Sequence, residues 1–347
     1  MSAPLKPSEI VRQLDQHVIG QNDAKRTLAV AIYTHFRKMA WSESGAVDIT
    51  KSNILLIGPT GTGKTLLCET LAKILDVPFV TADATSLAQT EYVSEEIEAM
   101  LHRLLDRADG DMERAQRGII FIDEIDKLRS ISGQARAASG ESVQHALLKI
   151  MEGAPVRLKS GQHIDTTHIL FICGGAFVGL DKILEKTHTF GFISTSDDQN
   201  EKIIDRLNSR VKPTDLREFG LIPEFAGRLP IVARLQDLTR EMLVRIMIEP
   251  RSAIYRQFAE ILREDGIKLS VARTVFEQIA ELAMEYKAGA RSLRGIFEEM
   301  MTGVLYAIPD TPGLSEVIIT SMFEEAQLIS QPAPATCAGS RRAHPGR

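Results

Sequence analysis

The stretch that decides the fold is Asn53–Thr65, "NILLIGPTGTGKT". Its run of apolar residues from Ile54 to Ile57 predicts a short strand that is buried on both faces. Gly58–Thr65 fits the pattern G-x-x-x-x-G-K-[ST], and the apolar spacing of the following "TLLCETLAKIL" predicts a helix. A glycine-rich turn between a strand and a helix can point backbone N–H groups at phosphates, so this stretch predicts a nucleotide site.

The whole turn is assigned to nucleotide binding. Its residues are Gly58, Pro59, Thr60, Gly61, Thr62, Gly63, Lys64 and Thr65. The ammonium group of Lys64 is expected to reach the β- and γ-phosphates, and the hydroxyl of Thr65 is expected to bind Mg²⁺.

A second motif, "IIFIDE" at Ile119–Glu124, is an apolar strand that ends in two acids. The pair could simply cap the next helix. Combined with the turn above, Asp123 is interpreted as a second holder of Mg²⁺ and Glu124 as the base that polarises the attacking water. The two motifs together predict a protein that binds ATP with Mg²⁺ and hydrolyses it.

Around these motifs, short apolar strands such as "PFVTAD", "THILFICGG" and "GRLPIVARL" alternate with amphipathic helices. That alternation predicts an α/β fold with a parallel sheet between helices. Helical patterns dominate after about residue 235. We therefore expect a nucleotide-binding domain over residues 1–235, a mainly helical small domain over residues 236–325, and a disordered tail over residues 326–347, where the composition is small, polar and proline-rich.

Composition excludes several classes of protein. The chain has 347 residues, 44% of them hydrophobic and 25% charged, with a net charge of −5, so it lacks the basic excess typical of nucleic-acid or membrane-surface binders. No apolar run is long enough to span a membrane. Cys68, Cys173 and Cys337 form no C-x-x-C pair, so we expect no zinc site, and a cytoplasmic location fits.

Longer motifs occur in a characteristic order: "LDQHVIGQNDAKRTLAVAI", "GPTGTGKT", "GIIFIDEIDKL", "SGESVQHALLKIMEG", "ILFICGGAF", "FGLIPEFAGRLPIV" and "AGARSLRGI". In these motifs the chain closely resembles the ClpX family, the AAA+ unfoldases of the Clp protease, over roughly residues 8–322. The first thirty or so residues are equally similar to the sister family HslU. The family's N-terminal four-cysteine zinc domain has no counterpart in this sequence. The resemblance implies an AAA+ P-loop large domain, a small helical AAA+ domain, and ATP-driven unfolding of protein substrates by a ring of six subunits.

The resemblance also implies roles for residues outside the two motifs. Val18 and Ile19 match the segment that flanks the adenine base, although plain core packing would also account for them. Arg228 matches the arginine finger that reaches the nucleotide of a neighbouring subunit. Arg291 matches the second-sensor arginine of the small domain, with Arg294 as the weaker candidate.

A further match is Tyr92-Val93, which aligns with the family's Gly-Tyr-Val-Gly loop in the central channel. An aromatic–aliphatic pair makes sequence-tolerant contact with any polypeptide. The alternative is an ordinary helix start with Ser94 as the N-cap. Both glycines of the family pattern are replaced, and Glu91 with the glutamates after Ser94 would make this part of the channel acidic.

The family's peptidase-docking loop has its nearest match at Phe190, Gly191 and Phe192. This apolar tip could plug a pocket of a ClpP-type peptidase, or it could anchor its own loop. Two further channel loops, residues 129–141 and 156–168, differ from the family pattern. Docking of a peptidase therefore stays open at this point.

Two other functions remain to be weighed against the unfoldase. A nucleic-acid motor is argued against by the acidic residues near Tyr92, and we expect no nucleic-acid partner and no membrane partner. A non-catalytic assembly factor that uses ATP only as a switch is argued against by intact Lys64, Asp123, Glu124 and Arg228. A ClpX-like remodelling ATPase without a peptidase is the nearest variant of the main interpretation, in which a homo-hexamer acts on proteins.

Overall fold

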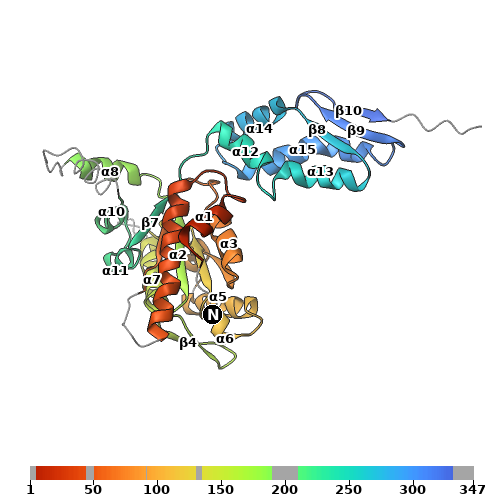
Figure 1. Ribbon diagram of the computed structural model, residues 1–347. Coiled ribbons are helices and arrows are strands. Elements are labelled where there is room, and N and C mark those ends of the chain that lie inside the picture. Colours follow the sequence, from red (N-terminus) through yellow and green to blue (C-terminus); the bar gives the residue numbers. More distant parts are fainter. Residues whose placement is uncertain (1–4, 44–50, 91, 130–134, 190–209, 331–347) are drawn as a thin grey trace, which may run out of the picture. The chain divides into compact units, whose positions relative to one another are not determined.

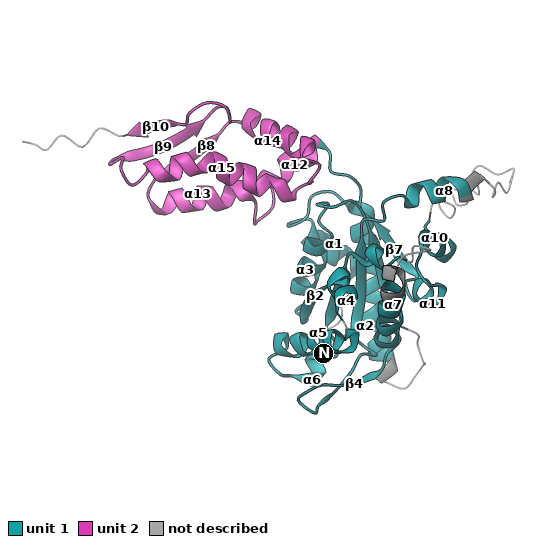
Figure 2. Ribbon diagram, turned by 180° about the vertical axis from the view of Figure 1, so that it is seen from behind, with its two compact units in different colours: residues 1–239 teal, residues 240–347 magenta. Residues whose placement is uncertain are grey.

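The computed structural model describes residues 5–43, 51–90, 92–129, 135–189 and 210–330. The chain divides into two compact units, residues 1–239 and 240–347 (Figure 2). Each unit is described by itself.

Unit 1 is built on a parallel sheet of five strands with the order β2-β3-β6-β1-β7 (Figure 1). The strands are β1 (Ile54–Ile57), β2 (Phe79–Asp83), β3 (Ile119–Asp123), β6 (Leu170–Gly175) and β7 (Ile231–Arg234). β1, β3 and β6 are the interior strands of this order and are almost wholly buried, as their continuous apolar runs predict. The α/β fold with a parallel sheet is confirmed.

Alternate residues of the strands face two separate cores. Leu55, Ile120 and Phe171 belong to the core on one side of the sheet, and their neighbours Leu56 and Phe121 belong to the core on the other. This alternation follows from the two-residue period of a strand. Helices α1 (Pro7–Leu14), α2 (Asn22–Glu43) and α3 (Lys64–Leu75) cover the second core, whereas α4 (Ala84–Gln89), α5 (Val93–Arg107) and α7 (Ala135–Glu152) cover the first (Figures 1 and 2).

The remaining elements of unit 1 are short. A hairpin of β4 (Pro155–Arg157) and β5 (His163–Asp165) extends between α7 and β6. The other helices within the described residues of unit 1 are α6 (Met112–Ala115), the 3₁₀ helix η1 (Ile125–Leu128), α8 (Leu180–Thr189), α10 (Pro213–Phe219) and α11 (Pro223–Gly227).

Unit 2 is mainly helical, as expected. Its helices are α12 (Arg240–Ile248), α13 (Ile254–Glu264), α14 (Arg273–Glu285) and α15 (Arg291–Ala307). A three-stranded sheet in the order β10-β9-β8 consists of β8 (Lys268–Val271), β9 (Leu314–Ile319) and β10 (Gln327–Ser330). Its aromatic core includes Phe276, whose ring stacks on that of Phe297 with centroids 6.2 Å apart.

The end of the chain differs in part from the sequence-based expectation. Residues 327–330, which composition assigned to the disordered tail, form β10 and pair antiparallel with β9. The open edge of β9 offers them backbone hydrogen-bond partners, an effect that composition does not reveal. Residues 331–347 lie outside the described part of the chain.

Candidate functional site

The turn between β1 and α3 has the backbone that a phosphate cradle needs. Gly61 (φ 80°) and Gly63 (φ 96°) both adopt the left-handed conformation that glycine tolerates best. Gly58 lies against the end of β7, because an ideal Cβ on it would be 2.8 Å from the Cβ of Leu235. Its amide also donates to the carbonyl of Gly175 at 3.1 Å, which ties the turn to the end of β6.

Lys64 is the first residue of α3 and is buried. Its ammonium group donates to two carbonyl oxygens of the turn, Gly58 O at 2.6 Å and Pro59 O at 3.1 Å. The structure therefore holds a buried positive charge against the glycine-rich turn, where it can attract an anion.

Thr65 and Asp123 come together from different elements. The hydroxyl of Thr65 at the start of α3 donates to Oδ2 of Asp123 at the end of β3 over 3.4 Å. Two hard oxygens this close suit Mg²⁺, which takes one or two protein oxygens together with phosphate and water oxygens. Within the described residues no group of three or more His, Cys, Asp or Glu side chains is arranged to hold a metal. The donor set at Thr65 and Asp123 thus fits a magnesium–nucleotide complex, whose phosphate and water oxygens would complete the coordination.

Glu124 has an uncommon backbone. Its φ of 58° and ψ of 30° lie in the left-handed region, and its amide donates to Oδ1 of Asp123 at 2.9 Å. Left-handed residues other than glycine are costly, and they concentrate at functional sites. The side chain of Glu124 is exposed beside the half-buried Asp123, which leaves its carboxylate free to meet a ligand.

A third acid in the same motif, Asp126, was not singled out in the sequence. It is buried, and its Oδ2 accepts a hydrogen bond from the amide of Phe177 at 3.2 Å, which fastens η1 to the loop after β6. Gly175 is required beside it, since an ideal Cβ there would lie 2.6 Å from Oδ1 of Asp126. The repeat of acids in "IDEID" was the signal that could have revealed it.

Val18 and Ile19 lie in the segment between α1 and α2 and are 5% and 6% exposed. Gln21 anchors this segment, because its side chain exchanges two hydrogen bonds with the backbone of Gln236, at 2.9 and 2.8 Å. Lys25 anchors it again. Its Nζ donates to the carbonyl of Val18 at 2.5 Å and to Oδ1 of Asp15 at 2.7 Å.

Sequence reasoning missed both anchors. Lys25 is only 1% exposed and lies between the buried Ala24 and Leu28 of α2. A lysine on the apolar face of a helix was the available signal, because a buried lysine needs partners.

Arg228 follows the last residue of α11 and is about 41% exposed at its side chain. Its Nε and Nη2 both donate to Oε1 of Glu152, at 2.8 and 2.6 Å. Its carbonyl accepts from the side chain of Asn53 at 3.2 Å, just before β1. Arg228 is therefore tied to the amino end of β1, whereas the glycine-rich turn follows the carboxyl end.

In unit 2 the two candidate arginines differ. Arg294 is engaged, because it donates to Glu298 at 3.0 Å and to Gln257 at 2.5 Å. Arg291 is exposed at the start of α15 and makes no hydrogen bond or ion pair with the described residues.

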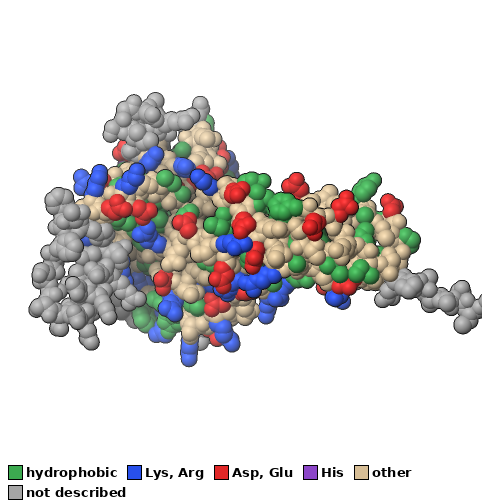
Figure 3. Space-filling model, turned by 90° about the horizontal axis from the view of Figure 1, so that it is seen from above, with side chains coloured by type: hydrophobic (Ala, Val, Ile, Leu, Met, Phe, Trp, Pro, Cys, Tyr) green, Lys and Arg blue, Asp and Glu red, His purple; other side chains and the backbone are tan. Residues whose placement is uncertain are grey.

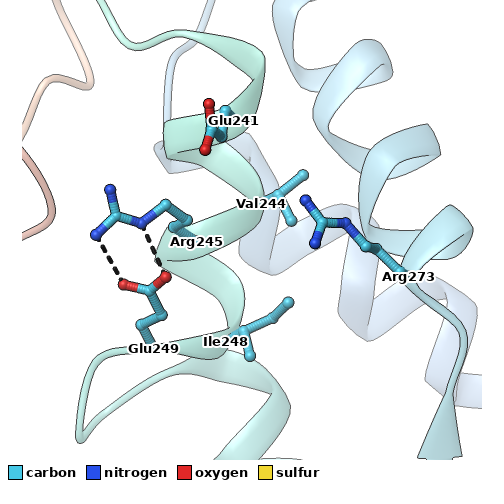
Figure 4. Close-up of a pocket in the computed structure, with 6 residues that line it drawn as sticks. All are labelled: Glu241, Val244, Arg245, Ile248, Glu249 and Arg273. Carbon is cyan, nitrogen blue, oxygen red and sulfur yellow. Dashed lines mark hydrogen bonds and ion pairs between the residues drawn. The ribbon is translucent and has the colours of Figure 1, made fainter.

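Unit 2 also has a pocket on α12, which is lined in addition by Arg273 at the start of α14 (Figure 4). In this pocket the side chain of Arg245 donates two hydrogen bonds to that of Glu249, at 2.8 and 2.9 Å.

Tyr92 is exposed to 64% and stands directly before α5. The helix begins at Val93, so the alternative with Ser94 as the N-cap is wrong. Ser94 lies within the first turn, and Tyr92, which occupies the N-cap position, makes no capping hydrogen bond. Val93 is half-buried and packs against the core, so it does not share the exposure of Tyr92. The tip of the β4–β5 hairpin lies close by, since Lys159 bonds Glu95 of α5 at 3.3 Å.

The remaining loop predictions fall mostly outside the described residues. Phe190, Gly191 and Phe192 lie outside them, as does Glu91, and so do residues 130–134 of the altered loop at 129–141. The described helices include none long and apolar enough to cross a membrane.

Comparison with known proteins agrees with this geometry. Residues 49–232 match the family model of the AAA domain (Cdc48 subfamily), and residues 238–309 match that of the C-terminal, D2-small domain of ClpB protein. A ClpX from Treponema denticola is 46% identical, with 90% of this chain and 80% of the relative covered. ClpX proteins from Bacteroides thetaiotaomicron and Porphyromonas gingivalis are 44% identical over 93% of this chain and 82% of each relative. The chain therefore belongs to the ClpX family of AAA ATPases and is an ATP-hydrolysing enzyme.

Proposed function

We propose that this ATPase is an ATP-dependent protein unfoldase that draws polypeptide through a ring of its own copies. The relatives carry the name "ATP-dependent Clp protease ATP-binding subunit ClpX". The observation that carries the proposal is the convergence of Lys64, Thr65 and Asp123 at the turn after β1, which supports binding of a nucleotide with a metal.

Each residue of this turn has a defined task. The backbone N–H groups of Thr60, Gly61, Thr62 and Gly63 and the ammonium of Lys64 bind the phosphates. Gly58 and Pro59 shape the turn, because proline has no N–H and the amide of Gly58 already donates to the carbonyl of Gly175. Thr65 and Asp123 would hold Mg²⁺, and the ion would supply positive charge beside the phosphates. Glu124 orients a water for in-line attack and accepts its proton. The left-handed backbone of Glu124 supports this role, because it turns the chain just where the carboxylate is needed.

Arg228 acts on the nucleotide of a neighbouring copy. Its carbonyl is bonded to Asn53, and β1 separates Asn53 from Gly58. Five residues of strand span about 16 Å, which exceeds the reach of an arginine side chain. The arginine therefore cannot serve the phosphates of its own turn, and a ring of six copies, as in the family, supplies the partner nucleotide.

The adenine base of ATP lies against Val18 and Ile19. Hydrogen bonds from the side chains of Gln21 and Lys25 hold this segment in place. The nucleotide-binding domain corresponds to unit 1, residues 1–239, and the small domain to unit 2, whose described sheet extends to residue 330. Arg291 of the small domain contributes the second arginine. Its freedom from partners among the described residues supports it over Arg294, which is already engaged.

Tyr92 grips the substrate in the channel. A tyrosine that is 64% exposed at the start of a helix is available for apolar contact with a chain of any sequence. Val93, the first residue of α5, packs against the core and does not contact the substrate directly.

A ClpP-type peptidase would dock at Phe190, Gly191 and Phe192, and the enzyme would work in the cytoplasm, where its buried free thiols Cys68 and Cys173 stay reduced. A remodelling ATPase without a peptidase differs only in this docking step. A nucleic-acid motor is not favoured. The net charge is −5, and on the face shown in Figure 3 acidic and basic side chains lie interspersed.

The test uses a tagged, stably folded fluorescent protein with ATP, with and without a ClpP-type peptidase. We expect the wild-type protein to cause loss of fluorescence. Glu124→Gln should cause none, although it should still bind ATP. Loss that needs the peptidase indicates docking, and loss without it indicates a free-standing remodelling enzyme. Normal ATP turnover by Glu124→Gln would refute the assignment of Glu124 as the general base. ATP turnover without loss of fluorescence, both with and without the peptidase, would refute the unfoldase function.

A further inference from the structure

The guanidinium group of Arg228 is held along one edge. Both contacts with Glu152, from Nε at 2.8 Å and Nη2 at 2.6 Å, go to the single oxygen Oε1. A guanidinium has five N–H groups in a rigid fork, and this grip uses the side edge. Nη1 and the outer hydrogen of Nη2 make no hydrogen bond with the described residues, so the end of the fork stays open for a bidentate anion.

The backbones that carry this pair are joined by one buried amide. Asn53 is 1% exposed, and its Nδ2 donates to the carbonyl of Met151 and to that of Arg228, each at 3.2 Å. These carbonyls belong to the residue before Glu152 and to Arg228 itself. One side chain thus fixes the end of α7 beside the end of α11 and links both to β1, which leads to the glycine-rich turn.

The pair contributes little to folding stability. The side chains of Arg228 and Glu152 are 41% and 42% exposed, and solvent screens an ion pair this open. Its consequence is orientation, because an unheld arginine would sample many rotamers before reaching a phosphate.

We propose that Glu152 is a positioning residue for the arginine finger. It holds the side edge of Arg228 so that the open end of the fork faces the γ-phosphate bound by a neighbouring copy. Asn53 sets the distance between the two backbones. The inference rests on the proposed role of Arg228 and adds a residue to it.

The experiment measures ATP turnover by assembled rings of Glu152→Ala, Glu152→Gln and Arg228→Ala. Arg228→Ala should lower kcat by about 10³-fold, as expected for a finger. Glu152→Ala should lower kcat on the order of tenfold with unchanged KM, because the charge remains but its placement is lost. Glu152→Gln should fall between Glu152→Ala and wild type, since its amide oxygen can still accept from Nε. Glu224→Ala, an exposed glutamate on α11 without such a contact, is the matched control and should behave as wild type.

The readout specific to positioning is the effect of Glu152→Ala on kcat in a chain that also carries Arg228→Lys. Lysine has no Nε edge, so Glu152→Ala should have no further effect there. An equal fall in both backgrounds, or a fall explained by loss of assembly, would overturn the proposal. Unchanged turnover would overturn it as well, and faster turnover would show that Glu152 restrains the arginine instead. If Arg228→Ala itself kept wild-type turnover, the finger assignment would fail, which is a separate result.

Discussion

Gly174→Ala is expected to destabilise unit 1 through a single contact. Gly174 lies near the end of β6, and an ideal Cβ there would be 2.6 Å from Cζ and 2.8 Å from Cε2 of Phe121. Carbon atoms in contact prefer about 3.5–4.0 Å, so the ring would have to move by roughly 1 Å. Phe121 is fully buried in the core beneath α1–α3, where close packing resists such a shift.

Overpacking of this kind costs about 1–3 kcal/mol of unfolding free energy. The same Cβ would also lie 3.3 Å from Oδ1 of Asp123. A shift of Asp123 by a fraction of an ångström should lower ATP turnover as well, by up to about 10²-fold.

The assay is urea unfolding without nucleotide, followed by tryptophan fluorescence. The chain has one tryptophan, Trp41, which lies in α2 of unit 1, so the signal reports that unit alone. Phe121→Leu in the same chain should relieve the clash, and the double variant should be less destabilised than the sum of the two single changes. Gly303→Ala in α15, where a Cβ meets nothing within 4 Å, is the control and should leave the fluorescence transition unchanged. A midpoint for Gly174→Ala equal to wild type, or strictly additive changes in the double variant, would refute the packing argument.

Three further outcomes are expected. Lys25→Met removes the charge-assisted bond to the carbonyl of Val18 and should weaken ATP binding about tenfold. Titration with a fluorescent ATP analogue measures this change. An unchanged Kd would show that the segment of Val18 and Ile19 does not hold the adenine base. Tyr92→Ala should leave ATP turnover intact but slow unfolding of the fluorescent substrate about tenfold, whereas Tyr92→Phe should retain it; equal rates in both would exclude Tyr92 as the grip. Burial lowers the pKa of His35 to about 4, whereas its pKa in the unfolded chain is about 6.5. Between these two pH values the unfolded state therefore binds more protons than the folded state. The free energy of unfolding should fall as the pH drops from about 6.5 to about 4. His35→Gln, which keeps a donor for the carbonyl of His168 at 3.1 Å, should flatten that dependence by an amount on the order of 3 kcal/mol, and an unchanged slope in chemical denaturation at several pH values would contradict it.

Much of the site was predictable because it is local in sequence. The glycine-rich turn needs its glycines, its lysine and its threonine at fixed spacing within one stretch, between a strand and a helix. The same holds for Asp123 and Glu124 at the end of an apolar run. The parallel sheet also followed from the sequence, since strands buried on both faces have continuous apolar runs.

Local spacing was less informative about exposure. Tyr92 and Val93 are neighbours with similar apolar character, yet Tyr92 is exposed and Val93 packs against the core. The difference depends on where α5 begins and how it lies on the sheet, and the boundaries of helices are the least predictable part of a sequence pattern.

The sequence by itself determined the fold class, the phosphate-binding turn and the acids that accompany it, because each depends on residues within one element or at its end. Only the tertiary structure decided what surrounds Arg228. Glu152 and Asn53 lie 76 and 175 residues away from it along the chain. It likewise decided that Lys25 anchors Val18 and that residues 327–330 close a sheet. The physical reason is the same in each case: a hydrogen bond between distant segments depends on the register and packing of the elements that carry them, which no local period encodes.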